Sequence, residues 1–180
     1  MILTGNKILK EHQAGKIKIS PFYEQQLNSN SYDFRLGNII KIYRNEILDP
    51  KIKQETDVID ISEKEITLYP NKIYLGHTYE TMGSDYYVPI IKAKSSIARL
   101  GLNIHATADL IDIGSYNEWT LQLNVIQPIK IHAGMLIGQV TFWTVQGEIK
   151  LYSGKYQGSK GPYESQMYKD FDEGGSIKWF

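Results

Sequence analysis

The sequence predicts a mostly β protein, a sandwich or closed barrel of short strands with one short N-terminal helix. Isoleucine is abundant, and so is tyrosine, with 13 tyrosines in 180 residues; both residue types favour half-buried strand positions. Fifteen glycines are spread between short apolar stretches, which is typical of short strands joined by frequent turns. One segment, from Thr4 as N-cap to Gly15 as terminator, has the pattern of a helix.

Alternation of apolar and polar residues predicts the strands. These are expected at 16–19, 32–36, 39–43, 65–69, 72–75, 87–92, 102–106, 119–125, 128–132 and 136–145. The polar, weakly periodic stretch 49–64 predicts a long excursion or arm. Within 119–125, alternation places Leu121 and Leu123 on one face and Thr120 and Gln122 on the other.

Composition limits the class of protein. The length fits one domain, expected over 1–151, followed by a C-terminal tail over 152–180. The 20 basic and 20 acidic side chains cancel, which disfavours a nucleic-acid-binding face. The absence of cysteine excludes disulfides, cysteine–zinc sites and thiol nucleophiles. With no long apolar run or secretory signal, we expect a soluble, cytoplasmic protein that is not bound to a membrane.

The start of the tail, 152–161, carries three glycines, two lysines and two tyrosines. Two interpretations remain open for it. One is a frayed terminus. The other is a mobile lid whose lysines and tyrosines close over an anionic ligand that contains a ring.

Two segments carry residues suited to chemistry. In 92–101, lysines, adjacent serines and an arginine would suit a triphosphate, although a solvated loop is the alternative. In 105–114, Asp112 stands between two isoleucines and needs a partner or a function, whereas His105 has the alternative of a purely structural role. The four histidines are scattered, so no metal site made of protein ligands alone is expected. Any metal would be Mg²⁺ held with a phosphate substrate.

Several motifs, in order and spacing, resemble the dCTP deaminase family of the dCTP deaminase/dUTPase superfamily, from Met1 to about Tyr168. They are Ile17–Phe22, Ser31–Gly37, Ser95–Leu102, His105–Ala108, Ile111–Gly114, Ala133–Gln139 and Lys155–Gly158. The resemblance implies a distorted β-barrel of jelly-roll type. It also implies a homotrimer with active sites at subunit interfaces, a C-terminal tail over the nucleotide (dCTP or dUTP), and Mg²⁺ with the triphosphate.

The resemblance also implies roles for individual residues. Ser95 and Arg99 match the serine and arginine that hold the pyrimidine end and the reactive water. Asp112 matches an aspartate near the sugar, which in related dUTPases positions or activates the attacking water. Lys94 stands where the family usually has arginine, so its charge is kept but the bidentate fork is lost. The other matching nucleotide-binding positions are Ser96, His105, Ala108, Tyr152, Lys155 and Tyr156.

One position departs from the family pattern. Gln122 occupies the place of the glutamate that takes a proton from water in the deaminases, and an amide has no usable basicity. Three functions therefore remain open. The first is deamination of dCTP to dUTP and ammonia, weakened at Gln122. The second is dUTP diphosphatase activity through Asp112 and Mg²⁺, and the third is nucleotide binding without catalysis.

Overall fold

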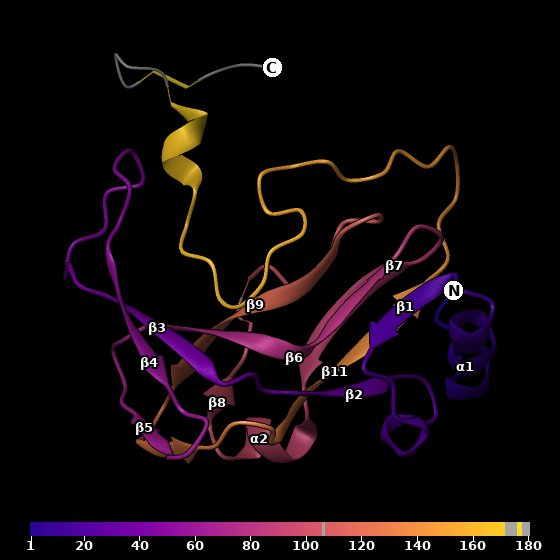
Figure 1. Cartoon of the computed structure of the whole chain (residues 1–180), viewed down its shortest axis with the longest axis horizontal. Helices are drawn as coiled ribbons and strands as arrows, with labels where there is room; N and C mark the ends of the chain where they lie inside the picture. Colours follow the sequence, from indigo (N-terminus) through magenta and orange to yellow (C-terminus); the bar gives the residue numbers. More distant parts are fainter. Residues whose placement is uncertain (106, 172–175, 178–180) are drawn as a thin grey trace.

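The structure, a computed structural model, describes residues 1–105, 107–171 and 176–177 (Figure 1). Its N-terminal helix α1, Gly5–Gln13, is the expected one. The hydroxyl of Thr4 accepts a hydrogen bond from the Lys7 N–H at 3.4 Å and caps the helix. Gly15 follows its end with φ of 72°, a left-handed conformation that suits glycine. No helix in the described ranges is long and apolar enough to cross a membrane.

The largest sheet has six strands and supports most of the candidate site. In order across the sheet they are β4 (Thr56–Asp60), β3 (Ile39–Tyr43), β6 (Tyr74–Ser84), β9 (Tyr116–Val125) and β8 (Leu102–Asn103), with β1 (Ile17–Ser20) also beside β6. The long strands β6 and β9 pair antiparallel at the centre, with Leu75 opposite Gln122. Their register shifts between His77 and Thr81 of β6, so the two strands are bent where they continue past this point.

Two smaller sheets complete the β structure. One pairs β10 (Ile129–Ile131) with β5 (Ile66–Leu68). The other has the order β2 (Tyr32–Arg35), β11 (Leu136–Trp143) and β7 (Val88–Ala93).

Short helices lie in the connections. A second helix, α2 (Ser95–Arg99), follows β7, and 3₁₀ turns lie at Glu24–Gln26 and Met167–Asp170. The large side chains fully buried in the one hydrophobic core include Ile8, Tyr32, Phe34, Leu36 and Phe142. The mostly β fold of distorted sheets is confirmed, although the sheets do not close into one continuous barrel.

Three of the expected element boundaries differ from the structure. The strand expected at 102–106 ends at Asn103 as β8, and residue 106 lies outside the described residues. The stretch 49–64 contains the edge strand β4, which pairs with β3 along its whole length. The residues of β4 are exposed or half-buried, so its sequence shows little hydrophobic alternation.

The strand expected at 72–75 continues to Ser84 as β6, in which Gly83 interrupts the alternation of apolar and polar side chains. A side chain at Gly83 would place its Cβ 2.2 Å from the Ser115 carbonyl oxygen, so the close approach of β6 to the start of β9 requires glycine.

A fully buried carboxylate, Glu80, ties β2 to β6. It accepts hydrogen bonds from the Arg35 Nε at 2.8 Å, the Arg35 N–H at 2.9 Å and the Gln26 side chain at 3.2 Å. The Arg35 guanidinium also lies 4.6 Å and 4.3 Å from the ring centroids of Tyr23 and Tyr79. Removing Glu80 would leave this cation without its counter-charge.

Glu80→Ala is therefore expected to lower the free energy of unfolding by about 3–5 kcal/mol. Urea unfolding followed by circular dichroism measures the change. The matched control is Glu65→Ala, because Glu65 also pairs with a cation, Lys130, but at the surface. The control should leave the free energy of unfolding nearly unchanged. Equal shifts in the two variants would contradict a structural role for the buried pair.

Candidate functional site

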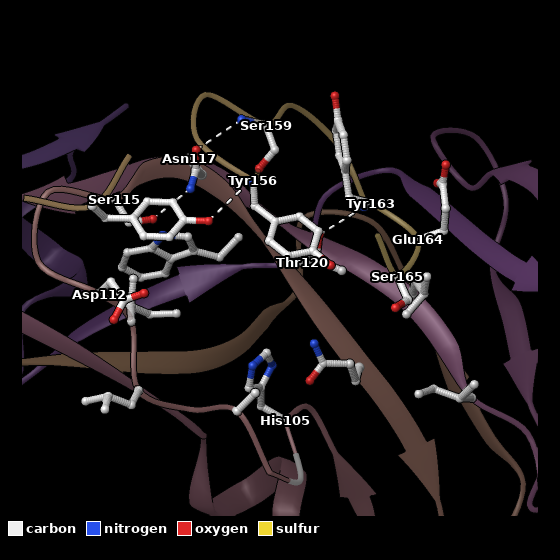
Figure 2. A pocket seen from close by; sticks show the side chains of 18 of the residues that line it. His105, Asp112, Ser115, Asn117, Thr120, Tyr156, Ser159, Tyr163, Glu164 and Ser165 are labelled. Atoms are coloured by element: carbon white, nitrogen blue, oxygen red, sulfur yellow. Dashed lines mark hydrogen bonds between the residues drawn. The ribbon is translucent and has the colours of Figure 1, made fainter. Parts of the chain in front are cut away.

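Side chains from β9, from the loop that joins β8 to β9 and from the C-terminal tail enclose a cavity of about 490 Å³. Figure 2 shows Asp112 toward one end, Glu164 toward the other, and the His105 ring between them. Six of the predicted site residues line this cavity: His105, Ala108, Asp112, Gln122, Tyr152 and Tyr156. The cavity volume is typical of a small-molecule site.

Strand β9 presents Gln122 to the cavity because its residues alternate between faces. Leu121 and Leu123 are fully buried in the core, whereas Thr120 and Gln122 are half-buried and line the cavity. The predicted alternation is confirmed. An amide at this position can both donate and accept hydrogen bonds, which suits recognition of a polar ring edge.

The tail residues 157–166, here called the strap, run beside β9 and cover the cavity (Figures 1 and 2). Four alternate strap amides donate to side chains of the large sheet: Ser159 to Asn117 Oδ1 (3.0 Å), Gly161 to Glu118 Oε2 (2.7 Å), Tyr163 to Thr120 Oγ1 (2.9 Å) and Ser165 to Tyr43 Oη (3.0 Å). This period of two is that of an extended strand, bonded here mainly to side chains, with one backbone hydrogen bond from the Glu118 N–H to the Ser159 carbonyl at 3.1 Å. An ion pair between Lys41 and Glu164 at 2.8 Å adds a charged contact.

Burial changes the charge state of groups at the cavity. It lowers the pKa of the His105 imidazole below its ordinary value, against the opposing effect of the Ala108 and Ile104 carbonyls, so the ring is neutral near pH 7. Burial, the largest single influence, would raise the pKa of Glu164, but the hydrogen bonds from Lys41 and the backbone, together with the charges of Lys41 and Lys53, outweigh it and the net pKa is lowered. Burial also raises the pKa of the Tyr43 phenol, which therefore stays protonated.

The structure does not bring the remaining predicted residues into this cavity. Ser95, Ser96 and Arg99 lie exposed on α2, and Lys94 precedes that helix. The Lys94 ammonium pairs with the buried Asp33 carboxylate. Lys94 and Ser95 line a separate polar hollow of about 220 Å³. Within one copy of the chain, the predicted site residues therefore lie in two separate places, which we call the two half-sites: the cavity and helix α2. Helix α2 lies on the opposite side of the molecule from most of the tail (Figure 1).

Lys155 also lies outside the cavity lining. Its ammonium contacts Asp170 Oδ2 at 2.5 Å instead. Several further residues line the cavity that no sequence motif indicates: Tyr43, Ser115, Asn117, Trp119, Ser159, Tyr163, Glu164 and Ser165. Alternation along β9 signals Thr120 beside Gln122, but no sequence pattern predicts that the strap lies against this strand.

Together, the distorted sheets, the strapped cavity, and the carboxylate and amide inside it define a β protein with a ligand-sized site. A family model described as dCTP deaminase-like matches residues 2–145, and the chain belongs to this family. A protein of Clostridium botulinum (strain Eklund 17B / Type B), named dCTP deaminase, dUMP-forming, is 46% identical over 174 residues, covering 96% of this chain and 100% of that protein. A protein of the same name from Leptospira biflexa is 41% identical, covering 96% and 99% of the two chains.

Comparison of structures supports the fold. The crystal structure of 2'-deoxycytidine 5'-triphosphate deaminase from Agrobacterium tumefaciens superposes with a TM-score of 0.62 at 20% identity. The match covers 78% of this chain and 47% of that longer one. At this identity, the likeness shows the fold alone.

The names of the relatives correct the expected reaction. We expected deamination to end at dUTP and ammonia, but these full-length relatives, at 40–46% identity, are named for the formation of dUMP. The expectation of dUTP as the product is therefore wrong. The dUTP diphosphatase and non-catalytic alternatives are not favoured either, because the same relatives are named as deaminases.

Proposed function

We propose that the protein converts dCTP and two water molecules to dUMP, ammonia and pyrophosphate at a single site. The observation that carries this proposal is that relatives aligned over their full length, one of them 46% identical, are named as dUMP-forming dCTP deaminases. The cavity supports it, because it places an amide and a carboxylate in one ligand-sized space beneath the strap.

The two chemical steps need different groups. In the first, a water oxygen bonds to C4 of cytosine, the bond from C4 to the amino nitrogen breaks, and ammonia leaves. Gln122 would bind the pyrimidine edge through its amide. In the second, another water attacks the α-phosphorus and pyrophosphate leaves. Asp112 would orient this water and accept its proton, while Tyr152 and Tyr156 would cover the nucleotide and exclude bulk water.

In this scheme, Mg²⁺ would enter the site bound to the triphosphate. In the described ranges, no group of three or more His, Asp or Glu side chains could hold a metal ion. We propose that phosphate oxygens supply most of the ligands, as is usual for Mg²⁺. When bound, the ion would neutralise charge on the triphosphate.

We also propose that a second copy of the chain completes each site, in a homotrimer. The separation of the predicted site residues supports this proposal. Asp112 and Gln122 line the cavity, whereas Arg99 and Ser95 are exposed on α2. A neighbouring copy would present α2 at the open cavity and supply a cation, Arg99, that the described lining of the cavity lacks.

This arrangement predicts complementation between two inactive variants. Arg99→Ala and Asp112→Asn should each have little dUMP-forming activity when assembled alone. After unfolding and refolding together in equal amounts, roughly one quarter of the sites would combine intact halves and regain activity. The assay is dUMP release from dCTP. A mixture no more active than its components would contradict shared sites, provided that gel filtration shows reassembly.

Product analysis tests the proposed reaction itself. The purified protein is incubated with dCTP and Mg²⁺, nucleotides are separated by chromatography, and ammonia and pyrophosphate are assayed enzymatically. We expect dUMP, ammonia and pyrophosphate in equal amounts. Accumulation of dUTP, or no turnover of dCTP, would contradict the proposal.

A further inference from the structure

Deamination requires a proton acceptor, and Gln122 cannot be that group. The proton must leave the attacking water as its oxygen bonds to C4 and must later reach the departing nitrogen. Among the described residues that line the cavity, the side chains that can accept a proton near pH 7 are His105, Asp112 and Glu164. Phenols are poor bases near neutral pH.

Two of these three groups, Glu164 and Asp112, are poor candidates because each has another contact or role. Glu164 pairs with Lys41 at 2.8 Å, and this contact favours its unprotonated form and weakens it as a base. It also lies at the far end of the cavity from Asp112 (Figure 2). In the proposed scheme, Asp112 acts in the attack of water on the α-phosphorus. It lines the cavity together with Ser115 and Tyr152.

His105 remains and has the properties of a base. Its ring points into the cavity, with Asp112 to one side and Glu164 to the other (Figure 2). Its Nδ1 is buried and makes no hydrogen bond of ordinary geometry in the part of the chain that the structure describes, although the Ala108 and Ile104 carbonyls lie near enough to favour the protonated ring. A buried polar atom without a partner is costly, so the unpaired nitrogen suggests a site built for a ligand or a bound water.

We propose that His105 is the catalytic residue that moves protons during deamination in this chain, where residue 122 is an amide and not a carboxylate. The inference rests on the proposed function. The neutral imidazole takes a proton from the attacking water and passes it to N3 of the ring. It then takes the proton of the new 4-hydroxyl group and gives it to the amino nitrogen. The C4–N bond breaks with its electron pair on nitrogen, ammonia leaves, and the 4-carbonyl of uracil forms.

The test compares His105→Asn in two backgrounds. Asparagine keeps hydrogen-bonding groups near the Nδ1 position but is not basic. In the otherwise unchanged chain, ammonia release from dCTP should fall by about 10²-fold or more. In the Gln122→Glu background, where a carboxylate can carry the proton, the same change should cost only about a few fold. Pyrophosphate release from supplied dUTP should be little affected in either background, which shows that the fold is intact.

The control variant is His132→Asn, because His132 is exposed at the turn before β11 and lies outside the cavity. It should leave ammonia release unchanged. Equal losses from His105→Asn in both backgrounds would show a structural role and overturn the inference. Full ammonia release from His105→Asn would overturn it while leaving the proposed function intact. An unchanged chain that releases no ammonia from dCTP would overturn both.

The pH profile gives a second readout. Because burial lowers the pKa of His105, ammonia release should rise with pH through a value below the ordinary histidine range and then level off. The charged groups that act on the ring or share its cavity are Lys92, Asp109, Asp112 and Glu164. In the Gln122→Glu variant, the rise should move to the lower range of a carboxylate. The same profile in both proteins would contradict proton transfer by His105.

Discussion

Gln122→Glu is expected to raise the rate of ammonia release from dCTP by about 10²-fold or more. Gln122 lines the cavity from β9, and the substitution keeps the shape of the side chain while adding a basic carboxylate. A carboxylate placed at the reactive carbon of cytosine can take the proton of water more effectively than the amide. Steady-state rates of ammonia release measure the gain.

The matched control is Gln127→Glu, which adds the same charge at an exposed position after β9. It should leave ammonia release unchanged. Pyrophosphate release from dUTP reports separately on the phosphate step and should change much less than deamination in Gln122→Glu. If Gln122→Glu gave no gain, the pyrimidine C4 would not lie beside residue 122, and the proposed orientation of the nucleotide would be wrong.

Asp112→Asn is expected to lower the formation of dUMP by about 10²- to 10⁴-fold. The carboxylate would orient and deprotonate the water that attacks the α-phosphorus, and asparagine can orient water but cannot take its proton. Ammonia release should continue, so dUTP would replace dUMP as the end product. Chromatography of the nucleotides formed from dCTP shows the change directly.

Asp109→Asn is the comparison for this prediction. Asp109 lies three residues earlier in the same loop, but it pairs with Lys92 and lies outside the cavity lining. We expect this variant to form dUMP at nearly the normal rate. If Asp112→Asn kept dUMP as its product, another group would have to activate the second water.

The local pattern of residues was enough to predict much of the fold. Thr4 and Gly15 marked the ends of α1, and strict alternation placed Gln122 and Leu123 on opposite faces of β9. Edge strand β4 was missed because neither of its faces is deeply buried, so its sequence has little of the alternation that a core imposes. The length of β6 was missed because Gly76 directly follows Leu75, and this glycine is set by its close contact with Leu123 of β9, which is distant in the sequence.

The candidate site was only partly predictable for a similar reason. Asp112 could be predicted because a carboxylate between two isoleucines would be costly to bury without a partner or a function. Tyr152 and Tyr156 could be predicted because they lie in a tail with few aliphatic residues. The strap contacts have no such signal. The Tyr163 amide bonds to Thr120 and the Ser165 amide bonds to Tyr43 only because the tail folds back onto the sheet. Backbone donors do not depend on residue type, so sequence cannot reveal them.

The central claim is that one site carries out both steps before the nucleotide leaves. Isotopically labelled dCTP supplied together with excess unlabelled dUTP tests it most directly. If both steps occur in the same cavity beneath the strap, label should pass into dUMP while the free dUTP pool stays almost unlabelled. Label that accumulated in free dUTP before reaching dUMP would contradict the account, because the deaminated nucleotide would then leave the site between the two steps.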